Sequence, residues 1–96
     1  MSAFDLHGQV AIVTGANTGI GQGIAIALAQ AGADIVVVSR RDPVETIRAL
    51  QALGRQSVWV NAELDSTRQL GDIVAQALSR FGRIDILVNN AGTIRR

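Results

Sequence analysis

The chain has 96 residues, of which 48% are hydrophobic and 18% are charged, and its formal net charge is +1. This length and composition suit one small globular domain and exclude a disordered chain. So small a net charge provides no field that would attract nucleic acid or an anionic membrane surface. The absence of cysteine excludes a disulfide framework and a thiolate metal site.

The sequence also lacks the signals of export and membrane insertion. No apolar run approaches the ~20 residues that a membrane-spanning helix needs. The first residues have no basic region followed by an apolar signal core. We therefore expect a cytoplasmic protein with no membrane partner, no nucleic-acid partner and no bound metal.

Short apolar runs alternate with amphipathic segments along the chain. Runs rich in β-branched residues predict buried strands at 10–13, 35–38, 57–60 and 84–88. Helices are predicted between them, over 19–31, from Asp42-Pro43, and from about Asp65-Ser66. Asp42 would cap the second helix and Pro43 would take its first position. The expected inward residues of the first two helices are Ile20, Ile24, Leu28, Ala31, Ile47, Leu50 and Leu53.

This order of elements predicts a fold of the α/β class. Right-handed crossovers between successive strands give a Rossmann-type doubly wound parallel sheet, truncated after the fourth strand, with strand order 3-2-1-4. Residues 1–96 would form the N-terminal dinucleotide-binding part of a single Rossmann-type domain. The run at 84–88 would then be an exposed apolar edge, so we expect low stability and a tendency to associate.

A glycine-rich loop joins the first strand to the first helix. Gly15 permits a tight turn, Gly19 permits close approach of a pyrophosphate, and Gly21 permits close packing of the helix. The N-terminal N–H groups of the helix would face the phosphates. A glycine-rich turn without a ligand is the alternative, but the position between a strand and a helix favours a phosphate site.

A second polar loop, Asn89-Asn90-Ala91-Gly92, follows the fourth strand. In the expected strand order, the first and fourth strands flank the switch point, where ligands bind beyond the carboxyl ends of the strands. Both loops would therefore open into one crevice. The alternative is a polar turn whose asparagines satisfy backbone groups.

With these two loops, the sequence resembles the short-chain dehydrogenase/reductase family over nearly its whole length. The segments Gly21-Gln22-Gly23 and 90–96 are similar to those of its sugar-acid members. The resemblance implies an NAD(P)-dependent oxidoreductase that acts on a secondary alcohol or ketone, with a sugar acid as one candidate substrate. It also implies a homo-oligomer for the full-length protein.

The resemblance further implies which residues contact the cofactor. Glycines of the first loop would line the pyrophosphate, and Asn89 would fix the sheet beside it. Glu63-Leu64 stands where the family more often has Asp-Leu near the adenine. The complete set is Gly15, Asn17, Thr18, Gly19, Ile20, Gly21, Ser39, Arg40, Glu63, Leu64, Asn89, Ala91 and Gly92.

The choice between NAD and NADP rests on the end of the second strand. Ser39 stands where NAD-preferring relatives usually carry aspartate, and a guanidinium such as that of Arg40 grips a 2′-phosphate. Against NADP, Thr18 stands where many NADP-preferring relatives have a basic residue, and sugar-acid relatives often use NAD. Both cofactors stay open, with the balance toward NADP.

The family's catalytic groups are missing from this chain. The resemblance implies a proton relay of tyrosine, lysine, serine and asparagine downstream of the second loop. The sequence contains no tyrosine and no lysine. We therefore expect no catalytic residue here and no activity of the 96-residue chain alone. Three readings remain: the cofactor-binding half of an enzyme, a non-catalytic nucleotide-binding module, and an inactive truncated fragment.

Overall fold

The computed structural model describes residues 5–62 and 67–90. Its strands and helices alternate as the sequence predicts, and all strand pairs are parallel. The strand order is β3-β2-β1-β4, which confirms the Rossmann-type arrangement. The elements are β1 (Val10–Thr14), α1 (Gly19–Gln30), β2 (Asp34–Ser39), α2 (Val44–Ala52), β3 (Ser57–Asn61), α3 (Thr67–Phe81) and β4 (Ile86–Asn89).

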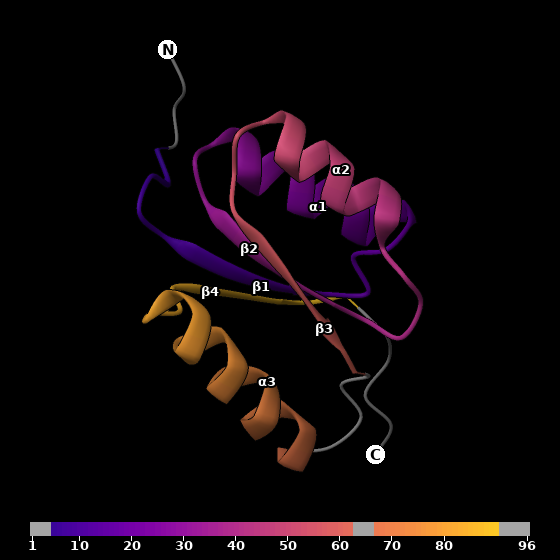
Figure 1. Cartoon of the computed structure of the whole chain (residues 1–96), viewed down its shortest axis with the longest axis vertical. Helices are drawn as coiled ribbons and strands as arrows, with labels where there is room; N and C mark the ends of the chain where they lie inside the picture. Colours follow the sequence, from indigo (N-terminus) through magenta and orange to yellow (C-terminus); the bar gives the residue numbers. More distant parts are fainter. Residues whose placement is uncertain (1–4, 63–66, 91–96) are drawn as a thin grey trace.

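The sheet lies between two helical layers. Helices α1 and α2 cover one face, and α3 covers the other (Figure 1). Because successive side chains of a strand point to opposite faces, β2 contributes Ile35 and Val37 to the layer under α1 and α2, and Val36 and Val38 to the layer under α3. Burial on both faces explains why the central strands are continuously apolar rather than alternating.

Helix α1 packs on the sheet through small residues. Gly21, Ala25 and Ala29 are its buried positions, each four residues from the next, so they form one stripe along the helix. Ile24 is only partly buried, and Ile20 is 77% exposed. The prediction that Ile20 faces inward is therefore wrong. A stripe without long side chains lets the helix lie close to the strands, and the larger residues are left beside the contact.

Helix α2 starts one residue later than the sequence suggested. Pro43, not Asp42, occupies the cap position, and no side-chain hydrogen bond caps the helix. The carbonyl of Pro43 accepts the backbone N–H of Ile47 at 2.9 Å, so the helical ladder begins there. At the other end, Leu53 is the C-cap and 39% exposed, which corrects its expected inward position.

Strand β4 lies at an edge of the described sheet and starts at Ile86 rather than at residue 84. The preceding residue, Asp85, still bonds to β1: its backbone N–H donates to the carbonyl of Val10 at 2.9 Å, and its Oδ2 accepts the backbone N–H of Val10 at 2.8 Å. Leu87 is 49% exposed, as expected for an apolar edge strand. The predicted start of the third helix at Asp65-Ser66 lies outside the described residues.

Candidate cofactor-binding site

The two loops singled out in the sequence meet at one end of the sheet. The carboxyl ends of β1 and β4 are adjacent, with Thr14 paired to Asn89. Helices α1 and α2 both begin at this end, after the turns that leave β1 and β2 (Figure 1). This is the switch point of a doubly wound sheet, where ligands bind in such folds.

The glycine loop has the backbone conformation that its glycines were expected to supply. Gly15 and Gly19 have positive φ angles of 65° and 61°, in the region that side chains with a Cβ rarely adopt. The backbone N–H of Gly15 donates to the carbonyl of Val38 at 2.8 Å, which ties the turn to β2. The loop is thus held by the sheet at its start and by α1 at its end.

Gly19 and Gly21 differ in what surrounds them. A Cβ added to Gly21 would overlap the carbonyl oxygen of Gly15 and lie 2.6 Å from Nδ2 of Asn90. A Cβ added to Gly19 would meet no atom within 4 Å. Gly21 therefore lets the start of α1 pack directly against Gly15 and Asn90. Gly19 faces open space, where a ligand can approach the backbone.

The N-terminus of α1 is suited to an anion. Thr18 is extended, with φ −151° and ψ 170°, and its side chain makes no capping hydrogen bond. The first turn carries no acidic residue. The N–H groups and the positive end of the helix dipole are therefore uncompensated by this helix's own side chains. A pyrophosphate fits this end of the helix.

Thr14 joins the glycine loop to the end of β4. Its Oγ1 donates to Oδ1 of Asn89 at 3.1 Å and accepts the backbone N–H of Asn90 at 2.9 Å. The Asn90 side chain donates through Nδ2 to the carbonyl of Gly15 at 3.4 Å. Asn89 thus lies beside the residue that precedes the glycine loop. Thr14 and Asn90 were absent from the expected set, although Asn90 belongs to the second polar loop and Thr14 ends β1 directly before the glycine loop.

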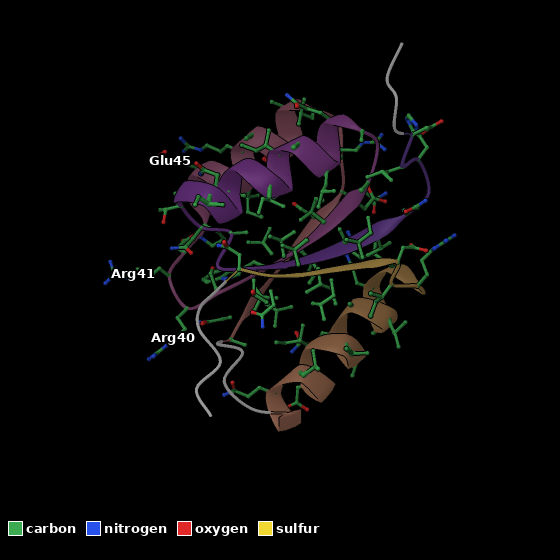
Figure 2. The ribbon with its side chains drawn as sticks, turned by 180° about the vertical axis from the view of Figure 1, so that it is seen from behind. Arg40, Arg41 and Glu45 are labelled. Atoms are coloured by element: carbon green, nitrogen blue, oxygen red, sulfur yellow. The ribbon has the colours of Figure 1, made fainter. Side chains whose placement is uncertain are left out.

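The end of β2 is organised around Ser39, which is 5% exposed. Its hydroxyl donates to the carbonyl of Arg41 at 2.7 Å, and its carbonyl accepts the indole N–H of Trp59 at 3.1 Å. Arg40 and Arg41 are exposed and project outward from the turn before α2 (Figure 2). Ser39 therefore shapes this turn, and the two guanidinium groups lie at its surface.

A buried hydroxyl in α2 also reaches the glycine loop, and sequence reasoning missed it. Thr46 is fully buried, and its Oγ1 lies 2.7 Å from the carbonyl oxygen of Ala16. The same hydroxyl accepts Nε2 of Gln22 at 2.9 Å. A threonine inside a helix has no local signature of such a role, because both partners lie at least 24 residues away.

Four of the expected cofactor residues, Glu63, Leu64, Ala91 and Gly92, lie outside the described residues. Within 5–62 and 67–90, no group of three or more histidine, cysteine, aspartate or glutamate side chains is placed to hold a metal ion. None of the helices in this described part is long and apolar enough to cross a membrane.

Comparison with known proteins agrees with this geometry. The 2-dehydro-3-deoxy-D-gluconate 5-dehydrogenase of Escherichia coli K12 is 51% identical to the chain over 96 residues, which is all of the chain and 38% of that enzyme. The chain therefore spans well under half the length of this relative.

Two solved structures with bound cofactor also match. L-sorbose reductase from Gluconobacter frateurii, complexed with NADPH and L-sorbose, is 37% identical with a TM-score of 0.86, over 96% of this chain and 36% of that one. A short chain dehydrogenase from Mycobacterium paratuberculosis bound to NAD is 33% identical with a TM-score of 0.81, over 93% and 38%. The sequence model of short chain dehydrogenases matches residues 9–96, and the chain belongs to that family.

Proposed function

We propose that this chain forms the cofactor-binding half of an NAD(P)-dependent oxidoreductase acting on the secondary alcohol or ketone of a sugar acid. The observation that carries the proposal is the contrast between Gly21, sealed against Gly15 and Asn90, and Gly19, open to the surroundings at an uncapped helix N-terminus. This arrangement suits a pyrophosphate.

The described residues suit distinct roles in binding the dinucleotide. The α1 N-terminus and Gly19 would hold the pyrophosphate, and Asn89 would keep the end of β4 in place beside it. A bound nicotinamide would supply hydride transfer to or from the substrate carbon. The sequence supplies neither a phenol nor an ammonium for the proton relay, so we expect binding without turnover from the 96-residue chain.

The proposed substrate class is supported by the 51% identical sugar-acid dehydrogenase. Because the chain matches only 38% of that enzyme, a fusion tests the proposal directly. We would join this chain to the remaining part of the E. coli relative and assay 2-dehydro-3-deoxy-D-gluconate with both cofactors. Turnover supports the full proposal. Dinucleotide binding without turnover would leave a non-catalytic binding module, and absence of both would indicate an inactive fragment.

For the cofactor, we propose a preference for NADP. Support comes from the two exposed guanidinium groups after β2 and from the absence of a carboxylate at Ser39. Arg40→Ala should weaken NADPH binding by about 10- to 150-fold, which corresponds to loss of a charge-assisted pair of about 1.5–3 kcal/mol, and should leave NADH binding unchanged. Arg48→Ala, at an exposed position of α2, is the matched control. Equal losses for both cofactors would contradict the preference.

A further inference from the structure

We propose that Thr46 is a positioning residue for the cofactor: its hydroxyl holds the glycine loop in the conformation that presents backbone N–H groups to a pyrophosphate. The inference rests on the proposed function and assigns a role to a residue outside both sequence motifs. Thr46 lies in α2, 30 residues from Ala16, whose carbonyl it contacts.

The first step is the direction of the hydrogen bonds around Thr46. The amide nitrogen Nε2 of Gln22 can only donate, so the Thr46 hydroxyl oxygen, 2.9 Å away, accepts this hydrogen bond. The single hydroxyl proton is then left for a carbonyl oxygen. That of Ala16 is nearest, at 2.7 Å, and that of Asn17 is at 3.4 Å. The chain of bonds therefore runs from α1 through α2 into the loop.

Second, the hydrogen bonds of Thr46 fix the orientation of two peptide units of the loop. In a trans peptide, the C=O and the following N–H point in opposite directions. With the Ala16 carbonyl turned to α2, the N–H of Asn17 points away from α2. The Asn17 carbonyl lies on the same α2 side, which directs the N–H of Thr18 away as well. Thr46 thus keeps carbonyl oxygens, which would repel phosphate, off the face that the N–H groups occupy.

The third step is burial. Thr46 is fully buried, as is Ala16, so water cannot replace the hydroxyl as partner of the carbonyl. Leaving a buried carbonyl oxygen without a donor costs free energy, which favours rotation of the peptide toward another donor. Rotation of this peptide would reverse the N–H of Asn17. Helix α2 begins just after the turn of Arg40 and Arg41. The hydrogen bond from Thr46 to Ala16 therefore connects the glycine loop, proposed to hold the pyrophosphate, with the helix that follows the two arginines.

The test compares variants of the 96-residue chain. Thr46→Val removes the hydroxyl at nearly constant shape, and Thr46→Ser keeps it. Thr46→Ala, favoured by the higher helix propensity of alanine, is a second hydroxyl-free variant if valine prevents folding. Ser79→Ala, exposed on α3, controls for loss of a hydroxyl as such. Folding is verified by far-ultraviolet circular dichroism before each measurement.

Two readouts separate positioning from general support of the fold. Amide hydrogen exchange of the cofactor-free protein should accelerate about tenfold in the hydroxyl-free variants at Gly15 and Gln22, whose N–H groups donate to the carbonyls of Val38 and Thr18 at the two ends of the loop. Amides within β1 and β2 should keep their protection. The dissociation constants of NADH and NADPH for the folded protein should rise about tenfold, which equals about 1.4 kcal/mol. Thr46→Ser and Ser79→Ala should stay within about twofold of wild type, a difference of about 0.4 kcal/mol.

Unchanged exchange at Gly15 and Gln22 in the folded hydroxyl-free variants would overturn the inference. So would a uniform rise in exchange across the sheet with unchanged dissociation constants, because that pattern describes a residue that only stabilises the fold. If wild type binds neither NADH nor NADPH, the proposed function fails separately, and the exchange measurement still decides whether Thr46 fixes the loop.

Discussion

Gly21 lies against Gly15 so closely that the smallest side chain would overlap the Gly15 carbonyl oxygen. Backbone, not a movable side chain, is the obstacle, so Gly21→Ala must displace α1 or the loop. We expect the free energy of unfolding to fall by about 1–3 kcal/mol, as for other overpacked sites, and dinucleotide binding to be lost. Urea denaturation and calorimetric titration measure the two effects.

Gly23→Ala is the matched control for this change. Gly23 lies in the same helix, is exposed, and a Cβ there would meet no atom within 4 Å. Alanine should stabilise the helix by about 0.5–1 kcal/mol relative to glycine and leave binding intact. If both variants bind equally well, the close packing at Gly21 has no part in the site.

Thr14 should matter through its hydroxyl. Thr14→Val leaves the partly buried backbone N–H of Asn90 without its 2.9 Å acceptor, at a cost of about 1–3 kcal/mol in the free energy of unfolding. Thr14→Ser keeps the acceptor and loses only a methyl group. The urea midpoint should therefore drop clearly more for valine than for serine. The reverse order would show that Thr14 contributes packing rather than the link to β4.

Asp85 should make stability depend on acidic pH. Hydrogen bonds from Arg83, at 2.8 and 2.5 Å, and from the backbone of Val10 hold the pKa of Asp85 below its ordinary value of 3.8. Since the folded pKa is lowered, this contribution is complete above the ordinary value and is lost as pH falls through the folded value.

The urea midpoint of wild type should accordingly fall more steeply below pH 3.8 than that of Asp85→Asn. Asp72→Asn, exposed on α3, controls for removal of a carboxylate elsewhere. Parallel curves for wild type and Asp85→Asn would mean that Asp85 does not link β4 to β1 in solution.

The edge strand β4 should make the 96-residue chain associate. Leu87 is 49% exposed on a strand whose outer side has no neighbour in the described sheet. Leu87→Lys should lower the weight-average mass seen by sedimentation at high protein concentration, because a charge opposes strand pairing. Glu45→Gln, at an exposed position of α2, is the control. A wild-type chain that stays monomeric at all concentrations would contradict this expectation.

The sequence was sufficient for the fold and for the glycine loop because both depend on local signals. Strand runs, helix periods and the glycine spacing lie within a few residues of one another. The packing face of α1 was not predictable in the same way, because the stripe of Ile20 and Ile24 and the stripe of Gly21 and Ala25 have the same spacing. Choosing the larger residues failed at Ile20, which is exposed, but not at Ile24, which packs against the core while partly buried. A helix that lies close to a sheet fully buries only its smaller residues.

The remaining site residues depend on contacts between distant parts of the chain. Thr46 reaches Ala16 across 30 residues, and Asn90 reaches Gly15 across 75. No local pattern marks a threonine within a helix as a partner of a loop carbonyl. Such residues become visible only when the crossing of α2 over the loop is known.

Binding of the dinucleotide tests the central claim most directly. We would titrate the 96-residue chain with NADPH and NADH by calorimetry, with the fluorescence of Trp59, the only tryptophan, as a second signal. The account predicts saturable binding with one cofactor per chain, lost in Gly21→Ala and kept in Gly23→Ala. A folded wild-type chain that binds neither nucleotide at millimolar concentration would contradict it.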